Sequence, residues 1–119
     1  MNTARLLAIG GFYLMNQFNA LGSGIEGETI IRPVSPIERS GEINYRAYQA
    51  TVTVLDQTGH TVTEFHSGAD GRFRISLEPG TYVLRPESPG SLPRAPKQTV
   101  TVLENEFTQV RITYDSGIR

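Results

Sequence analysis

The residues best suited to bind a metal ion lie in one short segment. His60, Glu64, His66 and Asp70 carry imidazole and carboxylate groups, which zinc takes as ligands. Side chains alternate along a strand, so Glu64 and His66 would share a face. His60 falls in the preceding turn and Asp70 lies across the next one, so only two ligands converge. We therefore interpret His60 as a turn residue and His66 as a solvated or edge side chain.

The chain is also poor in groups for nucleophilic catalysis, which needs a base beside a nucleophile and a third group that holds the base. It contains two histidines and no cysteine. The pair Asp70-Gly71 offers one carboxylate, whereas calcium takes about six to eight oxygen ligands. The geometry of a tight turn explains this pair. The sequence therefore predicts no catalytic residue, no cofactor and no metal site.

Two further sets of residues could contact a partner. The loop from 85 to 97 places basic residues among prolines, and it could adopt extended polyproline conformations, although we interpret it as a solvated linker. Strand alternation places Tyr82 and Tyr114 in the core rather than on the surface. An aromatic platform for sugar or peptide nevertheless stays open as an alternative, drawn from Tyr45, Tyr48, Phe65, Tyr82 and Tyr114.

These side chains must be positioned by short strands, as residues 70–84 illustrate. Asp70-Gly71 supplies the positive φ angles of a tight hairpin, and Pro79-Gly80 reverses the chain again. Between the two turns, apolar and polar residues alternate, which places Phe73 on a buried face and Arg74 on the outer face. The segment therefore predicts a β-meander with one buried face.

The same signals predict seven strands. Pro33 follows the first strand and has no amide to donate, which suggests an edge strand. The second strand alternates cleanly and should be central, and the last two should form a hairpin with Val100, Val102, Val110, Ile112 and Tyr114 pointing inward. The strands are Ile25–Arg32, Tyr48–Leu55, Thr61–His66, Arg72–Leu77, Thr81–Leu84, Thr99–Leu103 and Phe107–Tyr114.

Seven short antiparallel strands need two sheets packed face to face, since one open sheet would leave an apolar face in water. We therefore predict an all-β fold, a seven-stranded antiparallel Greek-key β-sandwich. The 119 residues are 38% hydrophobic and 19% charged, which indicates one globular domain. A net charge of −1 gives no reason to expect nucleic acid as a partner.

The first residues are typical of a secretory signal peptide. Arg5 precedes the uncharged run Leu6–Met15, and small residues precede a cleavage point after Gly22. A run of ten residues is too short to span a bilayer, so we expect no stable membrane insertion. We predict a signal peptide at 1–22 and a β-sandwich domain at 23–119, secreted or held in the periplasm or cell envelope. A short amphipathic or buried N-terminal helix is the alternative.

Residues 53–59 and 70–82 carry a family resemblance. The strand end Thr53-Val54-Leu55-Asp56, the turn Gln57-Thr58-Gly59 and the run from Asp70 to Tyr82 resemble the carboxypeptidase regulatory-like domains. That family has a prealbumin (transthyretin)-like β-sandwich, and the resemblance extends over residues 24–114. The chain also resembles small exported bacterial proteins of this group. In several of them, the position of Ser35 and a position near Asn44 would be cysteines. This chain has none.

The resemblance implies a non-catalytic exported module, with a binding or structural role at the cell envelope and a protein or carbohydrate as its partner. A small hydrolase or metal-dependent enzyme on the same fold is the alternative. Prealbumin-like hydrolases end in Tyr-Arg-Gly-Ser, and Tyr114-Asp115-Ser116-Gly117 departs from that motif. Self-association through an exposed edge strand is a third possibility, if Ile25–Arg32 is unpaired on one side.

Overall fold

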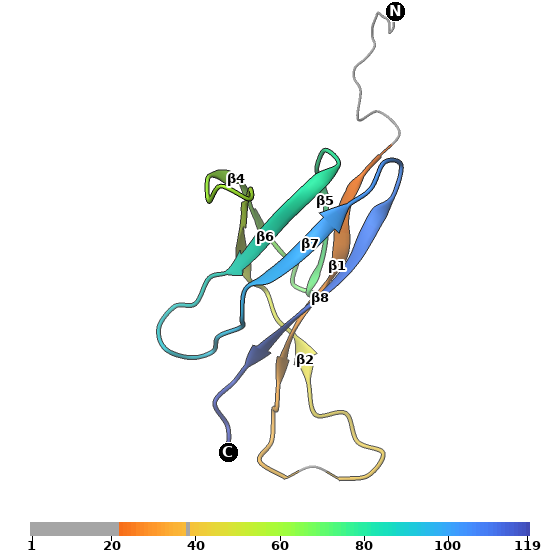
Figure 1. Cartoon of the computed structure of the whole chain (residues 1–119). Coiled ribbons are helices and arrows are strands. Elements are labelled where there is room, and N and C mark those ends of the chain that lie inside the picture. Colours follow the sequence, from red (N-terminus) through yellow and green to blue (C-terminus); the bar gives the residue numbers. More distant parts are fainter. Residues whose placement is uncertain (1–21, 38) are drawn as a thin grey trace, which may run out of the picture.

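The computed structural model describes residues 22–37 and 39–119, so all but the last residue of the predicted signal peptide lies outside the described residues. In the described part of the chain, no helix has the length and hydropathy needed to cross a membrane. Eight strands are present in these residues (Figure 1): β1 (Gly24–Arg32), β2 (Arg46–Ala47), β3 (Thr51–Leu55), β4 (Thr61–His66), β5 (Arg72–Ser76), β6 (Gly80–Pro86), β7 (Gln98–Val102) and β8 (Phe107–Asp115).

The strands form two sheets that pack face to face. One sheet has the order β4-β3-β6-β7, and the other places β2 and β5 on one side of β1 and β8 on its other side. The predicted β-sandwich is confirmed, and so is the central position of β3. The core between the sheets includes the whole set expected to point inward from the last two strands, namely Val100, Val102, Val110, Ile112 and Tyr114.

The prediction that the first strand is an edge is wrong, because β1 is paired on both sides. β1 pairs with β5 from Gly24 to Glu28 and with β2 at Ile30 and Ile31, both antiparallel. On its other side it pairs with β8 in parallel along its whole length. Pro33 lies beyond the ladder, so its missing amide does not restrict pairing within β1. Self-association through this strand therefore has no free edge to use.

The predicted meander and the final hairpin are also wrong in their pairing. β5 belongs to the sheet of β1 whereas β6 pairs with β3, so the turn at Pro79-Gly80 carries the chain between sheets. β7 and β8 likewise lie in different sheets. The alternation of apolar and polar residues indicates which face of a strand is buried. It does not indicate whether the next strand pairs in the same sheet or packs in the opposite one, because the same face is buried in both cases.

The predicted second strand is shorter than expected, and an eighth strand precedes it. The Ser67 hydroxyl accepts the Ala50 amide at 2.8 Å and donates to the Tyr48 carbonyl at 3.1 Å. The Tyr48 amide also donates to the Thr29 carbonyl of β1 at 3.0 Å, and the Ala50 carbonyl accepts the Ser67 amide at 2.9 Å. The β3 ladder, in contrast, begins at Thr51. The two-residue strand β2, which pairs with β1, lies just before residues 48–50.

The loop between β1 and β2 is closed by one side-chain amide. Asn44 Oδ1 accepts the backbone amides of Val34 and Ser35, each at 2.9 Å, and Asn44 Nδ2 donates to the Ser35 carbonyl at 3.1 Å. Ser35 and Asn44 are therefore neighbours. In this chain hydrogen bonds join them.

Tyr114 is fully buried, and its phenol should ionise at a higher pH than usual. Its hydroxyl donates to the Glu87 carbonyl at 2.6 Å, and its ring centroid lies 4.7 Å from that of Tyr48. Burial, assisted by the nearby Tyr48 and Glu87, raises the pKa of Tyr114 from 10.0 to about 12. A raised pKa means that the fold favours the neutral phenol. Its contribution to stability is therefore complete below pH 10.0 and is lost as the pH rises toward about 12.

An ultraviolet titration of the tyrosine phenolates tests this expectation. The wild-type protein should show a final step near pH 12 that Tyr114→Phe removes. If all the tyrosines ionise near pH 10.0, the phenol of Tyr114 is not buried as described.

Candidate ligand-binding face

The histidine and carboxylate candidates are not brought together. His60 Nδ1 contacts the Thr58 hydroxyl at 2.7 Å in the β3–β4 turn, and Asp70 accepts the Arg72 amide at 2.9 Å. His66 Nδ1 lies 2.8 Å from the exposed Thr51 hydroxyl, and within the described chain His66 has no carboxylate partner. Across residues 22–37 and 39–119, no group of three or more potential ligands is positioned to hold a metal ion.

The aromatic rings lie mostly in or against the core, as expected for Tyr82 and Tyr114, and the proline-rich loop is attached to β8 at one point. Phe65 and Tyr114 are core residues, Tyr48 and Tyr82 pack against the core, and Tyr45 is 39% exposed. These rings therefore do not share one accessible face. In the loop, the amide and carbonyl of Arg94 pair with those of Asp115, which attaches this part of the loop to the end of β8.

A group of polar side chains lies on the outer face of β5, β1 and β8. Alternation along each strand directs one set of residues into the core and the other set outward. On β5, for example, Phe73 is buried while Arg72 and Arg74 are exposed. The outward set, called here the arginine–glutamate face, consists of Glu26, Glu28, Arg72, Arg74, Gln109 and Arg111.

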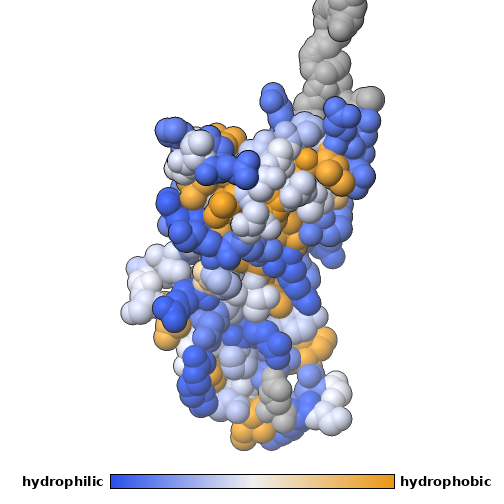
Figure 2. All heavy atoms as spheres, in the orientation of Figure 1, coloured by the Kyte–Doolittle hydropathy of each residue, from blue (hydrophilic) through white to orange (hydrophobic). Residues whose placement is uncertain are grey.

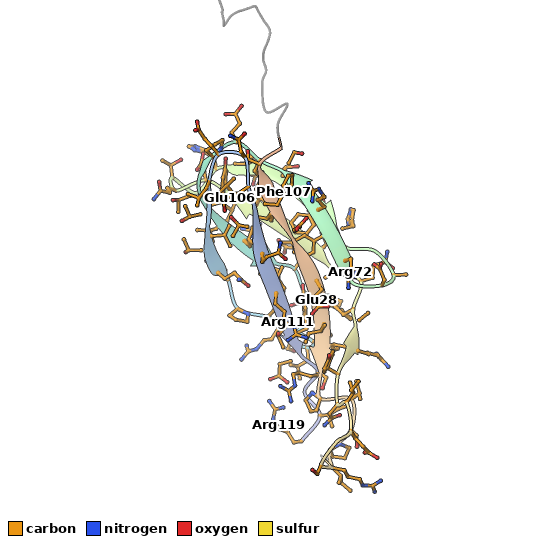
Figure 3. All side chains as sticks on the ribbon, turned by 90° about the vertical axis from the view of Figure 1, so that its right-hand side faces the viewer. Glu28, Arg72, Glu106, Phe107, Arg111 and Arg119 are labelled. Carbon is orange, nitrogen blue, oxygen red and sulfur yellow. The ribbon has the colours of Figure 1, made fainter. Side chains whose placement is uncertain are left out.

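Strand register arranges these six side chains in two rows. Glu28 on β1 lies between Arg72 on β5 and Arg111 on β8, and Figure 3 shows the three following one another across the sheet. Glu26 lies in the same way between Arg74 and Gln109. Each row therefore has an acidic centre on β1 with nitrogen donors on both sides.

Five of the six side chains are held by their neighbours. Arg111 Nε lies 3.0 Å from Glu28 Oε2. Arg74 pairs with Glu26, and Gln109 Nε2 donates to the other Glu26 oxygen at 2.6 Å. Both guanidinium groups also lie near aromatic rings, that of Arg74 at 3.6 Å from the centroid of Phe107 and that of Arg111 at 5.3 Å from the centroid of Tyr45.

Arg72 is the exception on this face. It lies opposite Glu28 in the ladder, but among the described residues no ion pair or hydrogen bond engages its guanidinium. Two shallow hollows adjoin on this face, and Gly27, Arg72 and Gln109 line both. Arg72 therefore presents its donors at the junction of the two hollows. An arginine stays charged at all ordinary pH values, so this group is a permanent cation.

The surface seen in Figure 2 has no continuous apolar region. Hydrophobic side chains are scattered there among hydrophilic ones. The larger exposed apolar residues lie outside both hollows beside Arg72: Val34, Ile37, Ile43 and Tyr45 in the β1–β2 loop, Val62 on β4, and Leu92, Leu103 and Ile118 after β6, β7 and β8. A polar ligand suits this molecule better than an apolar one.

A comparison with family models identifies the chain. The model of the carboxypeptidase regulatory-like domain matches residues 46–115, more than half of the sequence. The chain belongs to this family. Carboxypeptidase regulatory-like domains are non-catalytic β-sandwich modules with a prealbumin-like fold. The match covers Arg72, Arg74, Gln109 and Arg111 but not β1, so the two glutamates of the face lie outside it.

Solved structures with a similar fold include one from Bacillus anthracis. It is "The Bacillus anthracis TIE protein", with a TM-score of 0.51 and 21% sequence identity over 76% of this chain. The aligned part of this chain covers 16% of that chain. At this identity the likeness concerns the fold alone. No match was found among curated proteins.

The arginine–glutamate face was missed by sequence reasoning because each of its residues is an ordinary outward-facing side chain of its own strand. The signal was present as the alternations Arg72-Phe73-Arg74 and Glu26-Gly27-Glu28. Neither pattern reveals that the two segments are adjacent. That information lies in the register of strands that are far apart in the sequence of this carboxypeptidase regulatory-like domain.

Proposed function

We propose that this domain is an exported binding module of the cell envelope that takes its ligand on the arginine–glutamate face. The observation that carries the proposal is the guanidinium of Arg72, which is exposed and unengaged among the described residues while the side chains around it are held in place. The five flanking side chains, already held in position, lose less conformational entropy when a ligand binds, whereas Arg72 becomes ordered on binding. This arrangement favours binding.

Stability alone gives a weaker account of this face. The paired side chains are substantially exposed, with Arg74 at 63% and Arg111 at 52%. Exposed ion pairs contribute about 0 to 1 kcal/mol each, because water screens them. Arg72 forms no ion pair among the described residues, although it lies opposite Glu28 in the ladder. A binding role explains its position better.

Export is the second part of the proposal. It is supported by the uncharged run Leu6–Met15 and the small residues before Ser23. Ser23 is buried at the start of β1, where its hydroxyl donates to the Leu77 carbonyl at 2.7 Å and its carbonyl accepts the Leu77 amide at 3.0 Å. A chain that begins at Ser23 would keep both contacts.

The experiment combines secretion with envelope binding. The full-length chain is expressed in its source cells, and the exported protein should begin at Ser23 or within a few residues of it by mass spectrometry. Sedimentation with isolated envelope material should then show binding that Arg72→Ala weakens roughly ten- to a hundredfold, as expected for losing a charged hydrogen bond. Arg85→Ala, on the other sheet, is the matched control and should bind like the wild type.

Two results would contradict the proposal. Recovery of intact Met1 in the extracytoplasmic fraction would overturn the signal peptide. Equal binding by the wild type and Arg72→Ala would place the ligand elsewhere on the molecule.

A further inference from the structure

We infer that the ligand of the arginine–glutamate face is an acidic polysaccharide, bound through the carboxylate of a hexuronic acid residue to Arg72. This inference rests on the proposed function and names its ligand class. The planar guanidinium donates two parallel hydrogen bonds to a carboxylate, which is the geometry that arginine binds best. Arg72 has both donor edges unengaged among the described residues.

The charge pattern around Arg72 limits how many anionic groups a ligand can bring. Three arginines and two glutamates leave the six side chains of the face with one net positive charge, and Asp70, which lines one of the hollows beside Arg72, balances it. A ligand with an anion at every position, such as a nucleic acid or a densely sulfated chain, would meet Glu26 and Glu28, where like charges repel. One carboxylate among neutral groups fits this pattern.

The groups beside Arg72 suit hydroxyls. Glu28 Oε2 is held by Arg111, and its other carboxylate oxygen remains an acceptor. Gln109 uses its nitrogen on Glu26, so its amide oxygen also remains an acceptor for an incoming donor. Hydroxyl groups donate to such oxygens. Both hollows that adjoin Arg72 are also lined by Gln109.

The floor of the hollows disfavours an acidic peptide. Peptides commonly bind a sheet by adding a strand to an open edge. The floor here is β1, which β5 and β8 flank on both sides, so its backbone donors and acceptors are already used in the ladders. A saccharide needs no backbone partner, because its hydroxyls bond to side chains. The geometry therefore favours carbohydrate over peptide.

The aromatic residues at the two ends of the face could contact further sugar residues of a bound chain. Phe107 lies beyond the Glu26 row and Tyr45 beside Arg111, so both rows end near a ring. Tyr45 is 39% exposed. Aromatic rings offer an apolar surface beside polar groups, which suits the mixed surface of a sugar. The site thus fits a length of polysaccharide rather than a single small acid.

The test uses defined oligosaccharides and calorimetry with the exported chain. The probes are oligosaccharides that carry a single glucuronate or a single galacturonate among neutral sugars, each compared with its methyl ester, which removes the charge but keeps the hydroxyls. We expect at least one acidic oligomer to bind. Its methyl ester and Arg72→Gln should each weaken binding roughly ten- to a hundredfold. Arg85→Gln should bind like the wild type, and thermal melts of both variants should match the wild type because both side chains are exposed.

Several results would overturn the inference. They are failure of all acidic oligomers to bind, equal affinity for an acid and its methyl ester, or stronger binding of a glutamate-rich peptide than of any oligosaccharide. If envelope binding still depends on Arg72 in those cases, the proposed function stands and only the ligand class is wrong. If envelope binding does not depend on Arg72, both fail.

Discussion

Gly27→Ala should prevent the domain from folding stably. A Cβ atom added at Gly27 would lie 1.7 Å from the Val110 carbonyl oxygen and 2.7 Å from its carbon. Both atoms belong to the backbone of β8, so no flexible side chain can move aside. β1 and β8 would have to separate, and they pair at nine positions. The cost should exceed roughly 3 kcal/mol, the upper end for ordinary overpacking of a core.

Gly90→Ala is the matched control. Gly90 lies in the loop before β7, and a Cβ atom there meets nothing within 4 Å. We expect a change of less than about 1 kcal/mol, because the substitution adds no contact and slightly restricts the unfolded chain. Solubility, circular dichroism and urea denaturation measure both variants. A Gly27→Ala protein that unfolds at the same urea concentration as Gly90→Ala would refute the described pairing of β1 with β8.

Phe73→Ala should cost roughly 3 to 5 kcal/mol of unfolding free energy, the usual range for removing a large buried aromatic side chain. Phe73 is 7% exposed and lies in the core, where its ring centroid is 4.8 Å from that of Phe65 on β4. The substitution therefore removes a contact between the two sheets. It also leaves a cavity that the surrounding strands fill only in part.

Arg74→Ala is the control from the adjacent position on β5. The side chain is 63% exposed, and it contacts Glu26 and the ring of Phe107 at the surface. Its loss should cost below about 1 kcal/mol, as for an exposed ion pair. Urea denaturation compares the two variants. Equal losses would mean that the faces of β5 are assigned wrongly.

The fold class and the buried face of each strand follow from local sequence patterns in this chain. Apolar and polar residues alternate along β5 and β8, and the structure buries Phe73 and Val110 while it exposes Arg74 and Arg111. Gly71 has the expected positive φ, +80°, but Asp70 does not, and the turn joins β4 and β5 of different sheets rather than closing the predicted hairpin. The buried faces and the positive φ of Gly71 depend on neighbouring residues and on the period of the strand. For that reason they can be predicted without knowing which strands pair with one another.

The pairing of the strands and the candidate site could not be predicted from local patterns. The edge position expected for β1 and the hairpin expected between β5 and β6 were both wrong, because pairing depends on contacts between distant segments. The row of Arg72, Glu28 and Arg111 exists only because β1 lies between β5 and β8 in one register. A shift by one residue would turn Glu28 into the core. Alternation therefore determined which side chains face water, whereas long-range register decided which of them meet.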